Sequence, residues 1–446
     1  MMSLQLAAKA LKGVCHGVDT EFSSVSTDTR NIEPGDLYIA LQGENFDGHN
    51  YIDQALQAGA VAAIVHKDIA QNLPYIKVED TRKALGALSA LWRQSFNGKV
   101  VAITGSNGKT TVKEMLAAIL SEQGEVLATQ GNFNNDIGLP LTMLHMKNED
   151  YGVIEMGANH IGEIAYLTSL AQPDIAVITN AGASHLEGFG SLEGVAIAKG
   201  EIYQGLSEDG VAVINKDDSF SEYWHSICDC INIVTFSMCD KTSNVYGEWV
   251  QKEQGVELKV YACGEVFSVQ LKLHGRHNAM NALAAICVAH VFSVASEKII
   301  TALSRFEPVK GRLNIHRVNT QFCVIDDSYN ANPASLEAGI NVLKSLPGEH
   351  WLVMGDMGEL GKDEKRLHFS AGIKARELGV DCLLATGNAS RAAVEAFGEK
   401  ARFFESRDEL VSYIKQSRQQ ELGVLVKGSR FMHMENIVES LIEGAV

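Results

Sequence analysis

Short apolar runs alternate with segments of helical spacing along most of this chain. Strands that alternate with helices favour parallel sheets, because each helix returns the chain to the same end of the sheet. The pattern therefore predicts an α/β protein. The predicted strands are 35–41, 60–65, 100–104, 152–156, 174–179, 210–214, 322–327, 350–355, 381–387, 401–406 and 422–428.

Changes in this pattern divide the chain into three domains. A long helical segment, 81–96, predicts a connector between the first domain and the second. Residues 256–273 read as two alternating strands around Cys263 and Gly264, a small antiparallel insertion. The last part has the size of a doubly wound mononucleotide-binding fold. We therefore expect domains at 1–83, 84–311 and 312–446.

Length and composition agree with a multidomain soluble protein. A chain of 446 residues is too long for one core. The net charge of −17 argues against a surface for nucleic acid or anionic membrane, so an anionic ligand needs local donors and metal ions. No apolar run reaches about 18 residues, which excludes a membrane span, and the N-terminus lacks a secretory signal pattern. Eight scattered cysteines without a C-x-x-C pair predict free thiols in a reducing cytoplasm.

The glycine-rich stretch TGSNGKTT, residues 104–111, carries the strongest chemical signal. It follows an apolar strand and opens a helical segment, so backbone N–H groups and a positive helix end would surround a phosphate. Lys109 can then reach the β- and γ-phosphates, and the Thr110 hydroxyl can hold Mg²⁺. The alternative is an ordinary glycine-rich turn after a strand, which is less constrained than G-K-T-T in this setting. Ile103 replaces the first glycine of the common pattern, which indicates a specialised phosphate loop rather than a generic one.

Three further residues are candidates for chemistry. Glu155 closes an apolar strand, where phosphate-loop enzymes keep a carboxylate for Mg²⁺. His185 follows the strand at 174–179, and this position favours a role at the ligand edge over that of a solvated histidine. Lys199 lies in a helical run with Glu201 close by, and its spacing leaves open a surface lysine paired with that acid.

Six motifs stand in order over nearly the whole chain: TGSNGKTT, GNFNNDIGLP, IEMGANHIGEI, TNAGASHLEGFGS, AKGEI and GRHNAMNALAA. Together they resemble the motifs of the Mur ligases, the ATP-dependent amide-forming enzymes of peptidoglycan precursor assembly. The phosphate loop of that family has the form T-G-x-x-G-K-[ST], so the absent first glycine is part of the family pattern.

The two ends of the chain indicate which members of the family it resembles most. Residues 23–52 are similar to the uridine-binding domain of the two later-acting members, and the G-x-G-x-x-G of the earlier ones is absent. The stretches at 326–340 and 353–361 are similar to the last-acting member, and the D-N-P-R motif of many enzymes that add diaminopimelate is absent. The resemblance implies a small α/β uridine-binding domain, a central P-loop-type ATPase domain with a mostly parallel sheet, and a C-terminal Rossmann-like domain.

The resemblance also implies an activity. ATP with Mg²⁺ would phosphorylate the terminal carboxylate of UDP-MurNAc-tripeptide, and the amine of D-Ala-D-Ala would attack the acyl phosphate to form the pentapeptide precursor. We expect a cytoplasmic monomer with no nucleic-acid partner, and domain closure at hinges near 81–99 and 307–314. Whether the third residue of the tripeptide is lysine or diaminopimelate stays open.

The family roles carry over to matching positions of this sequence. Those implied for ATP are Thr104, Gly105, Ser106, Asn107, Gly108, Lys109, Thr110, Thr111, Asn278, Arg312 and Asp327. Those implied for Mg²⁺ are Thr110, Glu155, His185 and, as a carbamate formed with CO₂, Lys199; Lys109, His185 and Lys199 would be catalytic. Those implied for the substrates are Ser26, Asp28, Arg30, Asp47, Gly48 and His49 at the uridine diphosphate, Asn134 and Asn135 at the muramoyl part, and Tyr329, Asn330 and Asn332 at the dipeptide. For the N-terminal residues, capping or turn roles are the alternative.

Two other functions compete with this one. A different amide ligase of the superfamily is one, but the uridine-type N-terminus argues against a folylpolyglutamate synthetase and YNANP against the third-residue Mur ligase. The other is a protein that binds nucleotide for regulation or assembly. That function would leave Glu155, His185 and Lys199 without a shared purpose.

Overall fold

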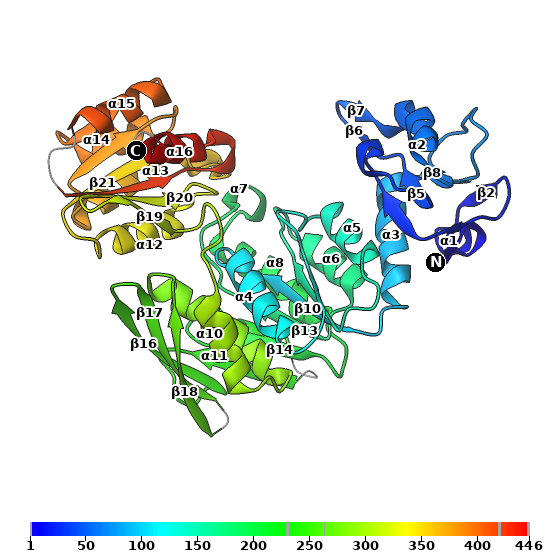
Figure 1. Cartoon of the computed structure of the whole chain (residues 1–446), viewed down its shortest axis with the longest axis horizontal. Coiled ribbons are helices and arrows are strands. Elements are labelled where there is room, and N and C mark those ends of the chain that lie inside the picture. The colour runs from blue at the N-terminus through cyan, green and yellow to red at the C-terminus, as the bar shows by residue number, and fades with distance from the viewer. Residues whose placement is uncertain (1, 229–231, 263, 418–420, 444–446) are drawn as a thin grey trace.

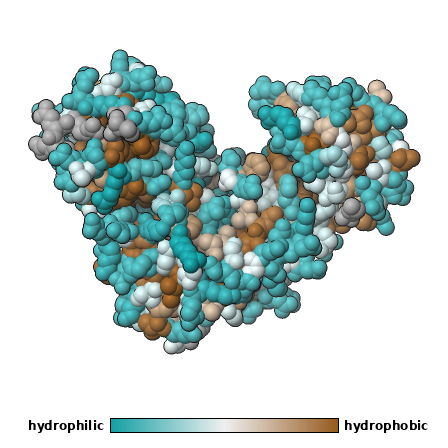
Figure 2. All heavy atoms as spheres, in the orientation of Figure 1, coloured by the Kyte–Doolittle hydropathy of each residue, from teal (hydrophilic) through white to brown (hydrophobic). Residues whose placement is uncertain are grey.

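The computed structural model describes residues 2–228, 232–262, 264–417 and 421–443. These residues form three lobes in chain order, each built around its own main sheet (Figure 1). The N-terminal and C-terminal lobes lie on either side of the central lobe, and the space-filling view is open between them (Figure 2). The expected three-domain α/β fold is confirmed.

The N-terminal lobe is a five-stranded sheet covered by short helices. The predicted strands at 35–41 and 60–65 are confirmed as the adjacent parallel strands β5 and β8. Helix α2 (Ile52–Ala58) ends at Gly59, whose φ of 110° suits the left-handed position after a helix. The sheet order is β2 (Val14–His16), β9 (Tyr75–Lys77), β8 (Ala62–Val65), β5 (Asp36–Ile39) and β4 (Ser24–Ser26).

The central lobe contains a nine-stranded sheet, and its four predicted strands are confirmed as β10, β12, β13 and β14. The predicted antiparallel hairpin is present as β17 and β18. It continues the main sheet, because β16 pairs with β17 on one side and with β15 on the other; Cys263 lies outside the described residues. The order is β11 (Val126–Ala128), β12 (Tyr151–Glu155), β10 (Lys99–Thr104), β13 (Ile175–Ile178), β14 (Val211–Asn215), β15 (Asn232–Ser237), β16 (Val245–Lys252), β17 (Gly255–Ala262) and β18 (Glu265–Leu271).

Alternation along β10 gives the central sheet its two cores. Val101 and Ile103 point into one core, and Val100 and Ala102 point into the other. A strand that is buried on both faces appears in the sequence as a continuous apolar run, and β10 could be predicted for this reason. The first core receives α4 (Lys109–Ser121), α10 (Arg276–Val291) and α11 (Ser296–Arg305), and the second receives α5 (Gly138–Leu144), α6 (Glu163–Ala171) and α8 (Leu192–Gln204).

Helix α3 (Thr81–Arg93) connects the first two lobes and packs against both. Its Leu85 and Leu88 share one apolar cluster with N-terminal residues and with Leu144 of the central lobe. The indole N–H of Trp92 donates to the Met146 carbonyl at 2.8 Å. The first expected hinge segment is therefore held by a continuous core.

The C-terminal lobe is a six-stranded sheet between two helical layers, and its five predicted strands are confirmed. A sixth strand, β19, was not predicted; it pairs antiparallel with β20 at the sheet edge. The order is β19 (Asn314–Asn319), β20 (Phe322–Asp327), β24 (Leu422–Lys427), β21 (Glu349–Met354), β22 (Cys382–Ala385) and β23 (Ala401–Phe403). One layer holds α12 (Pro333–Leu343), α13 (Glu364–Glu377) and α14 (Arg391–Phe397), and the other holds α15 (Arg407–Ser417) and α16 (Glu435–Glu443).

Two expectations drawn from composition can be compared with the structure. None of the helices in the described ranges is both long enough and apolar enough to cross a membrane. Cys15, Cys239, Cys323 and Cys382 are free thiols. Cys230 and Cys263 lie outside the described residues.

Candidate active site

The loop between β10 and α4 lies at the carboxyl edge of the central sheet. Its two glycines are required by close approach as well as by their positive φ angles. A Cβ on Gly105 would come within 1.8 Å of Thr179 Oγ1, and a Cβ on Gly108 within 2.3 Å of Asn281 Oδ1. Gly108 is also the N-cap of α4, so free backbone N–H groups of the first helical turn face outward from the loop.

Residues that follow β13 hold this loop in place. Thr179 Oγ1 and Asn180 Nδ2 both donate to the Asn107 carbonyl, at 2.6 and 3.0 Å. Asn107 N–H donates in return to Asn180 Oδ1 at 3.1 Å. Ser106 Oγ donates to the Gly182 carbonyl at 2.9 Å. The loop is thus fixed by neighbouring groups of the protein itself.

Glu155, at the end of the adjacent strand β12, is a buried carboxylate with both oxygens engaged. Thr110 Oγ1 donates to Oε2 and Asn134 Nδ2 donates to Oε1, each at 2.8 Å. Its backbone N–H donates to Thr129 Oγ1 at 3.0 Å, and the buried Lys113 holds the Thr129 carbonyl at 2.5 Å. The expected partners Thr110 and Glu155 therefore meet, and Lys113 and Thr129 support them.

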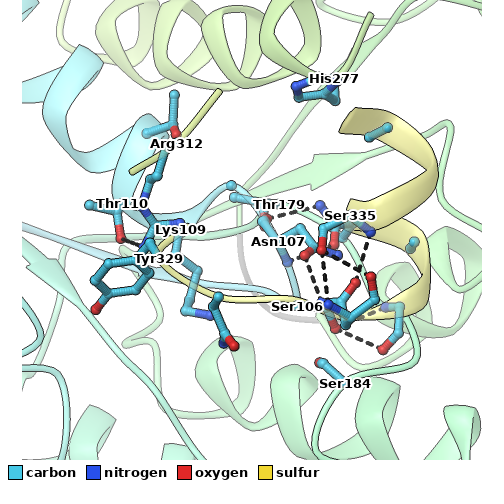
Figure 3. Close-up of a pocket in the computed structure, with 18 of the residues that line it drawn as sticks. Ser106, Asn107, Lys109, Thr110, Thr179, Ser184, His277, Arg312, Tyr329 and Ser335 are labelled. Atoms are coloured by element: carbon cyan, nitrogen blue, oxygen red, sulfur yellow. Dashed lines mark hydrogen bonds between the residues drawn. The ribbon is translucent and has the colours of Figure 1, made fainter. Parts of the chain in front are cut away.

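Cations from two lobes gather beside this carboxylate. Lys109 Nζ donates to the Gly105 carbonyl at 2.7 Å, and an Arg312 guanidinium N–H donates to Thr110 Oγ1 at 2.8 Å. Burial lowers the pKa of Lys109; Glu155 opposes this shift and Arg312 adds to it. Lys109, Thr110, Arg312 and Tyr329 group together on one side of the cavity (Figure 3).

The C-terminal lobe closes the cavity from the opposite side. Asn332 caps α12 through Ser335 N–H and also donates from Nδ2 to Asn107 Oδ1 at 2.8 Å. The Arg312 guanidinium lies over the Tyr329 ring, 4.3 Å from its centroid. Two residues expected at the dipeptide thus lie against the phosphate loop and its arginine.

Asp327, expected at the nucleotide, forms a buried ion pair with Lys427. Its other oxygen accepts the Leu313 N–H at 3.2 Å, and Lys427 Nζ also donates to the Asn330 carbonyl at 3.0 Å. Burial raises the pKa of Asp327, and Lys427 opposes that shift. Lys427 was not identified from the sequence, although a lysine that ends the apolar run of β24 was a usable signal.

We expect Lys427→Met to destabilise the C-terminal lobe by about 3–5 kcal/mol, because a buried carboxylate loses its cation. Chemical denaturation would measure the loss. The folded-state pKa of Asp327 would rise further above its unfolded value, so the loss should shrink as the pH falls through that raised pKa. Lys310→Met is the control, since Lys310 pairs with Glu439 at the surface and should contribute at most about 1 kcal/mol. Equal effects of the two substitutions would contradict the prediction.

Two of the expected catalytic residues lie near each other around Phe189. The His185 ring contacts the Phe189 ring edge-on, with 6.2 Å between centroids, and Lys199 Nζ lies 5.8 Å from the Phe189 centroid. His185 lines the cavity, and its Nδ1 lies 2.6 Å from Glu359 Oε2 of the C-terminal lobe. Glu359 was not identified from the sequence, although the glycine-rich stretch 353–361 that contains it was.

Lys199 is buried in α8, with 2% of its surface exposed. The alternative of a surface lysine paired with Glu201 is wrong, because Glu201 instead accepts the N–H groups of Gly162 and Ala165 at 2.7 and 2.9 Å. Among the described residues, Lys199 Nζ makes no hydrogen bond or ion pair. Burial lowers the pKa of Lys199 well below its usual value, and the charge of Lys109 adds to the effect.

The N-terminal candidates form turns in the first lobe. Asp28 caps a short 3₁₀ turn and binds the Arg30 side chain, whose hydrogen bonds lower the pKa of Asp28 to about 2. Asp47 accepts His49 N–H at 2.9 Å, and its bond from Lys67 lowers the pKa of Asp47. Both carboxylates act on Tyr38, whose pKa is raised to about 12, chiefly by burial. The two turns therefore adjoin the same tyrosine.

One cavity between the central and C-terminal lobes collects most of the expected site. Thr104 and Gly105 lie directly behind it at the end of β10, and Lys199 lies in the interior of α8. The structure does not bring the six N-terminal candidates to this cavity: Ser26, Asp28, Arg30, Asp47, Gly48 and His49 belong to the first lobe. The expected residues that line the cavity are Ser106, Asn107, Gly108, Lys109, Thr110, Thr111, Asn134, Asn135, Glu155, His185, Asn278, Arg312, Asp327, Tyr329, Asn330 and Asn332.

Known proteins share this combination of three α/β lobes and a glycine-rich loop at the cavity between two of them. Family models match in three stretches: Mur ligase family, catalytic domain, over 21–93; Mur ligase middle domain, over 103–289; and Mur ligase, glutamate ligase domain, over 311–430. The chain therefore belongs to the Mur ligase family.

Individual relatives are similar to this chain in sequence over almost its whole length. UDP-N-acetylmuramoyl-tripeptide–D-alanyl-D-alanine ligase of Escherichia coli (strain K12) is 42% identical, over 99% of this chain and 98% of its own. The enzyme of the same name from Bacillus subtilis (strain 168) is 37% identical, over 95% and 94%. Among solved structures, MurF from Acinetobacter baumannii has a TM-score of 0.93 at 37% identity and 98% coverage of both chains. MurF ligase from Thermotoga maritima, solved in complex with ADP, has a TM-score of 0.85 at 28% identity, covering 95% of this chain and 97% of that one.

Proposed function

We propose that this chain joins D-alanyl-D-alanine to UDP-N-acetylmuramoyl-tripeptide, with ATP converted to ADP and phosphate. The observation that carries the proposal is that the phosphate loop and Glu155 face polar residues of the C-terminal lobe across one cavity. Relatives named for this activity match the chain from end to end. Because ATP and UDP-linked sugars are cytoplasmic metabolites, we also propose that the reaction takes place in the cytoplasm, and that the enzyme acts as a monomer.

The reaction has two chemical requirements. A carboxylate does not react with an amine until one of its oxygens becomes a leaving group, so the γ-phosphoryl group of ATP is first transferred to the tripeptide. The amine of the dipeptide then attacks the acyl carbon, and phosphate departs as the amide forms. Lys109 and Arg312, both at the phosphate loop, supply positive charge where the phosphoryl group and the tetrahedral intermediate are negative.

The residues at the loop fit Mg²⁺. The Glu155 carboxylate and the Thr110 hydroxyl provide oxygen donors of the kind that Mg²⁺ takes, and His185 lines the same cavity. We assign Thr110 and Glu155 to one ion and His185 to a second. Bound there, Mg²⁺ would neutralise phosphate charge.

Lys199 is proposed to carry a carbamate. A buried amine without an acidic partner is poorly placed as a cation, and its lowered pKa favours the neutral form that can attack CO₂. The amine nitrogen would bond to the carbon of CO₂ and lose a proton to solvent. The product is an anionic oxygen ligand near Phe189 and His185.

The remaining roles follow the position of each residue. Asn278 lies in the first turn of α10 and donates from Nδ2 to the His274 carbonyl at 2.9 Å. We propose Thr104–Thr111, Asn278, Arg312 and Asp327 for ATP; Ser26, Asp28, Arg30, Asp47, Gly48 and His49 for the uridine diphosphate; Asn134 and Asn135 for the muramoyl part; and Tyr329, Asn330 and Asn332 for the dipeptide. We also propose domain boundaries at 83/84 and 311/312.

An omission assay tests the function. Purified protein is incubated with ATP, Mg²⁺, UDP-MurNAc-tripeptide and D-Ala-D-Ala, and phosphate release is measured after each component is left out in turn. We expect sustained release only in the complete mixture, because turnover requires the dipeptide to consume the acyl phosphate. L-Ala-L-Ala serves as the matched control for the dipeptide. Release that is the same without D-Ala-D-Ala would overturn the assignment.

A further inference from the structure

Two guanidinium groups lie at the ring of Tyr329, a residue expected at the dipeptide. The guanidinium carbon of Arg312 is 4.3 Å from the ring centroid, and that of Arg430 is 5.8 Å from it. Arg312 contacts the phosphate-loop helix through Thr110 Oγ1 (Figure 3). Arg430 follows β24 and begins a short 3₁₀ turn, Arg430–Met432. Tyr329 thus connects the arginine at the phosphates with a second arginine beside the cavity.

The turn that carries Arg430 is fixed to the rest of the C-terminal lobe. Ser429 N–H donates to the Asp356 carbonyl at 2.9 Å, and Ser429 Oγ accepts the Gly358 N–H at 2.7 Å. Met432 N–H donates back to the Ser429 carbonyl at 2.9 Å, which closes the turn. The backbone at Arg430 is therefore held in place, whereas its side chain extends into solvent.

Arg430 uses only part of its hydrogen-bonding capacity within the protein. Its Nη1 donates to Glu435 Oε1 at 2.9 Å. Within the ranges that the structure describes, its Nε and Nη2 have no hydrogen-bond partner. A guanidinium carries five N–H donors in a planar fork that matches a carboxylate. With side chains 62% and 19% exposed, the pair with Glu435 contributes little to folding. Its effect is to orient the guanidinium and to leave one edge of the fork for an anion.

The lysines and arginines that line the cavity are already committed to other groups. Lys109 and Arg312 contact the phosphate loop and the helix that follows it. Lys427 is held by a buried carboxylate of its own lobe, and Arg276 by a carboxylate just after β14. In the part of the chain that the structure describes, none of these four is left for a further anionic group. Arg430, beside the cavity, is the cation that remains available.

An exposed aromatic ring stands next to this arginine in the sequence. Phe431 is 60% exposed, and a Cβ placed on Gly358 would come within 2.9 Å of its Cε1. Gly358 lines the cavity, so the Phe431 ring lies at the cavity rim. Ligand sites combine apolar contact surface with a few polar groups that fix orientation. Arg430 and Phe431 together offer positive charge beside an apolar surface.

D-Alanyl-D-alanine has the features that such a surface recognises. It carries an amine at one end, a carboxylate at the other and two methyl groups between them. Its amine must reach the acyl phosphate, which forms at the phosphate loop. The guanidinium carbons of Arg312 and Arg430 lie no further apart than the sum of their distances to the Tyr329 centroid, and an extended dipeptide spans about 7 Å. A dipeptide whose amine is beside Arg312 can therefore extend its carboxylate to Arg430.

We propose that Arg430 binds the C-terminal carboxylate of the incoming dipeptide, with Phe431 beside its methyl groups. Arg430 thereby selects an acceptor that ends in a free carboxylate. The inference deepens the proposed ligase function and rests on it. Arg430 takes no part in activating the tripeptide, so it acts on the binding of the dipeptide and not on phosphoryl transfer.

Steady-state kinetics of Arg430→Gln test the proposal. We expect KM for D-Ala-D-Ala to rise by about 10–100-fold, because a hydrogen-bonded charge partner of the carboxylate is lost. The values of kcat, KM for ATP and KM for UDP-MurNAc-tripeptide should stay close to those of the unsubstituted enzyme. Arg430→Lys keeps the charge but not the fork, so it should raise KM for the dipeptide less. An unchanged KM for D-Ala-D-Ala, or an equal rise in KM for all three substrates, would overturn the proposal.

The C-terminal amide of the dipeptide, D-Ala-D-Ala-NH₂, shows which group Arg430 recognises. The unsubstituted enzyme should bind it about 10–100-fold more weakly than D-Ala-D-Ala, whereas Arg430→Gln should bind the two nearly equally. The amide is measured both as a substrate and as a competitive inhibitor of D-Ala-D-Ala, so slow turnover does not prevent the comparison. A preference for the free carboxylate that survives in Arg430→Gln would refute the assignment.

Two further variants are controls. Arg366→Gln changes a similarly exposed arginine of the same lobe, which pairs with Asp363, and it should leave every KM unchanged. Glu435→Gln removes the partner of Arg430 but keeps its guanidinium, so the preference for the carboxylate should persist; its loss would assign the effect to the ion pair instead. Circular dichroism shows whether each variant keeps its fold.

The proposed function and the role of Arg430 can fail separately. An unsubstituted enzyme without D-Ala-D-Ala-dependent turnover would contradict the proposed function. An active enzyme whose KM for D-Ala-D-Ala does not change in Arg430→Gln would contradict only the role of this arginine.

Discussion

Replacement of Lys109 by alanine is expected to abolish turnover, with kcat lower by about 10²–10³-fold or more. Lys109 begins α4 directly after the phosphate loop, and its Nζ already bonds the Gly105 carbonyl within that loop. In the unsubstituted protein, the ammonium group of Lys109 would neutralise the γ-phosphate as charge shifts toward the tripeptide carboxylate. The measurement is phosphate release at saturating substrates, together with ADP binding by calorimetry.

Lys99→Ala provides the comparison, because Lys99 stands at the opposite, exposed end of β10 and pairs with Asp174 at the surface. We expect it to keep near-normal activity. Near-normal activity of Lys109→Ala would mean that the loop does not bind the reacting phosphate.

The second large effect is expected for Lys199→Ala, which should lower the activity by about 10²-fold. Added bicarbonate or a short carboxylic acid should partly restore it. The buried side chain has no acidic partner among the described residues, so a plain ion pair cannot account for its position in α8. A small carboxylate could occupy the space vacated by the side chain and supply the missing anionic oxygens. Activity with and without added acid, over a range of acid concentrations, is the measurement.

Lys241→Ala, which changes an exposed lysine of the same lobe, should show neither the loss nor the rescue. The unsubstituted protein should also show a carbamate signal by ¹³C NMR in labelled bicarbonate, and Lys199→Ala should lack it. A folded Lys199→Ala protein that no acid restores, with no such signal in the parent, would argue for a purely electrostatic role of the lysine.

The fold could be predicted where burial leaves a pattern in the sequence. Strands such as β10 are apolar on both faces, so they are visible as continuous runs. Strand β19 was missed because NIHRVN, at a sheet edge, is half exposed and mostly polar. The hairpin at 256–273 was found, but its attachment to the main sheet depends on β15 and β16, whose pairing joins residues that no local pattern connects.

The same limit applies to the site. Lys109, Thr110 and Glu155 could be predicted because each lies at the end of a recognisable strand or the start of a helix. Glu359 could not, because its partner His185 is far away in sequence and in another lobe. Asn332 was placed near the dipeptide, yet its bond to Asn107 shows a contact with the phosphate loop that only the docking of two lobes creates.

The packing of α3 against both the N-terminal and the central lobe has a consequence for chimeric proteins. The proposed role of the N-terminal lobe in binding the uridine diphosphate suggests an experiment in which this lobe is exchanged between relatives. A junction at 83/84 would pass through the first turn of α3, and one after Arg93 would separate Leu85 and Leu88 from Leu144. Either graft would join surfaces that had not been matched to each other. A functional exchange would have to transfer α3 together with the part of α5 on which it packs.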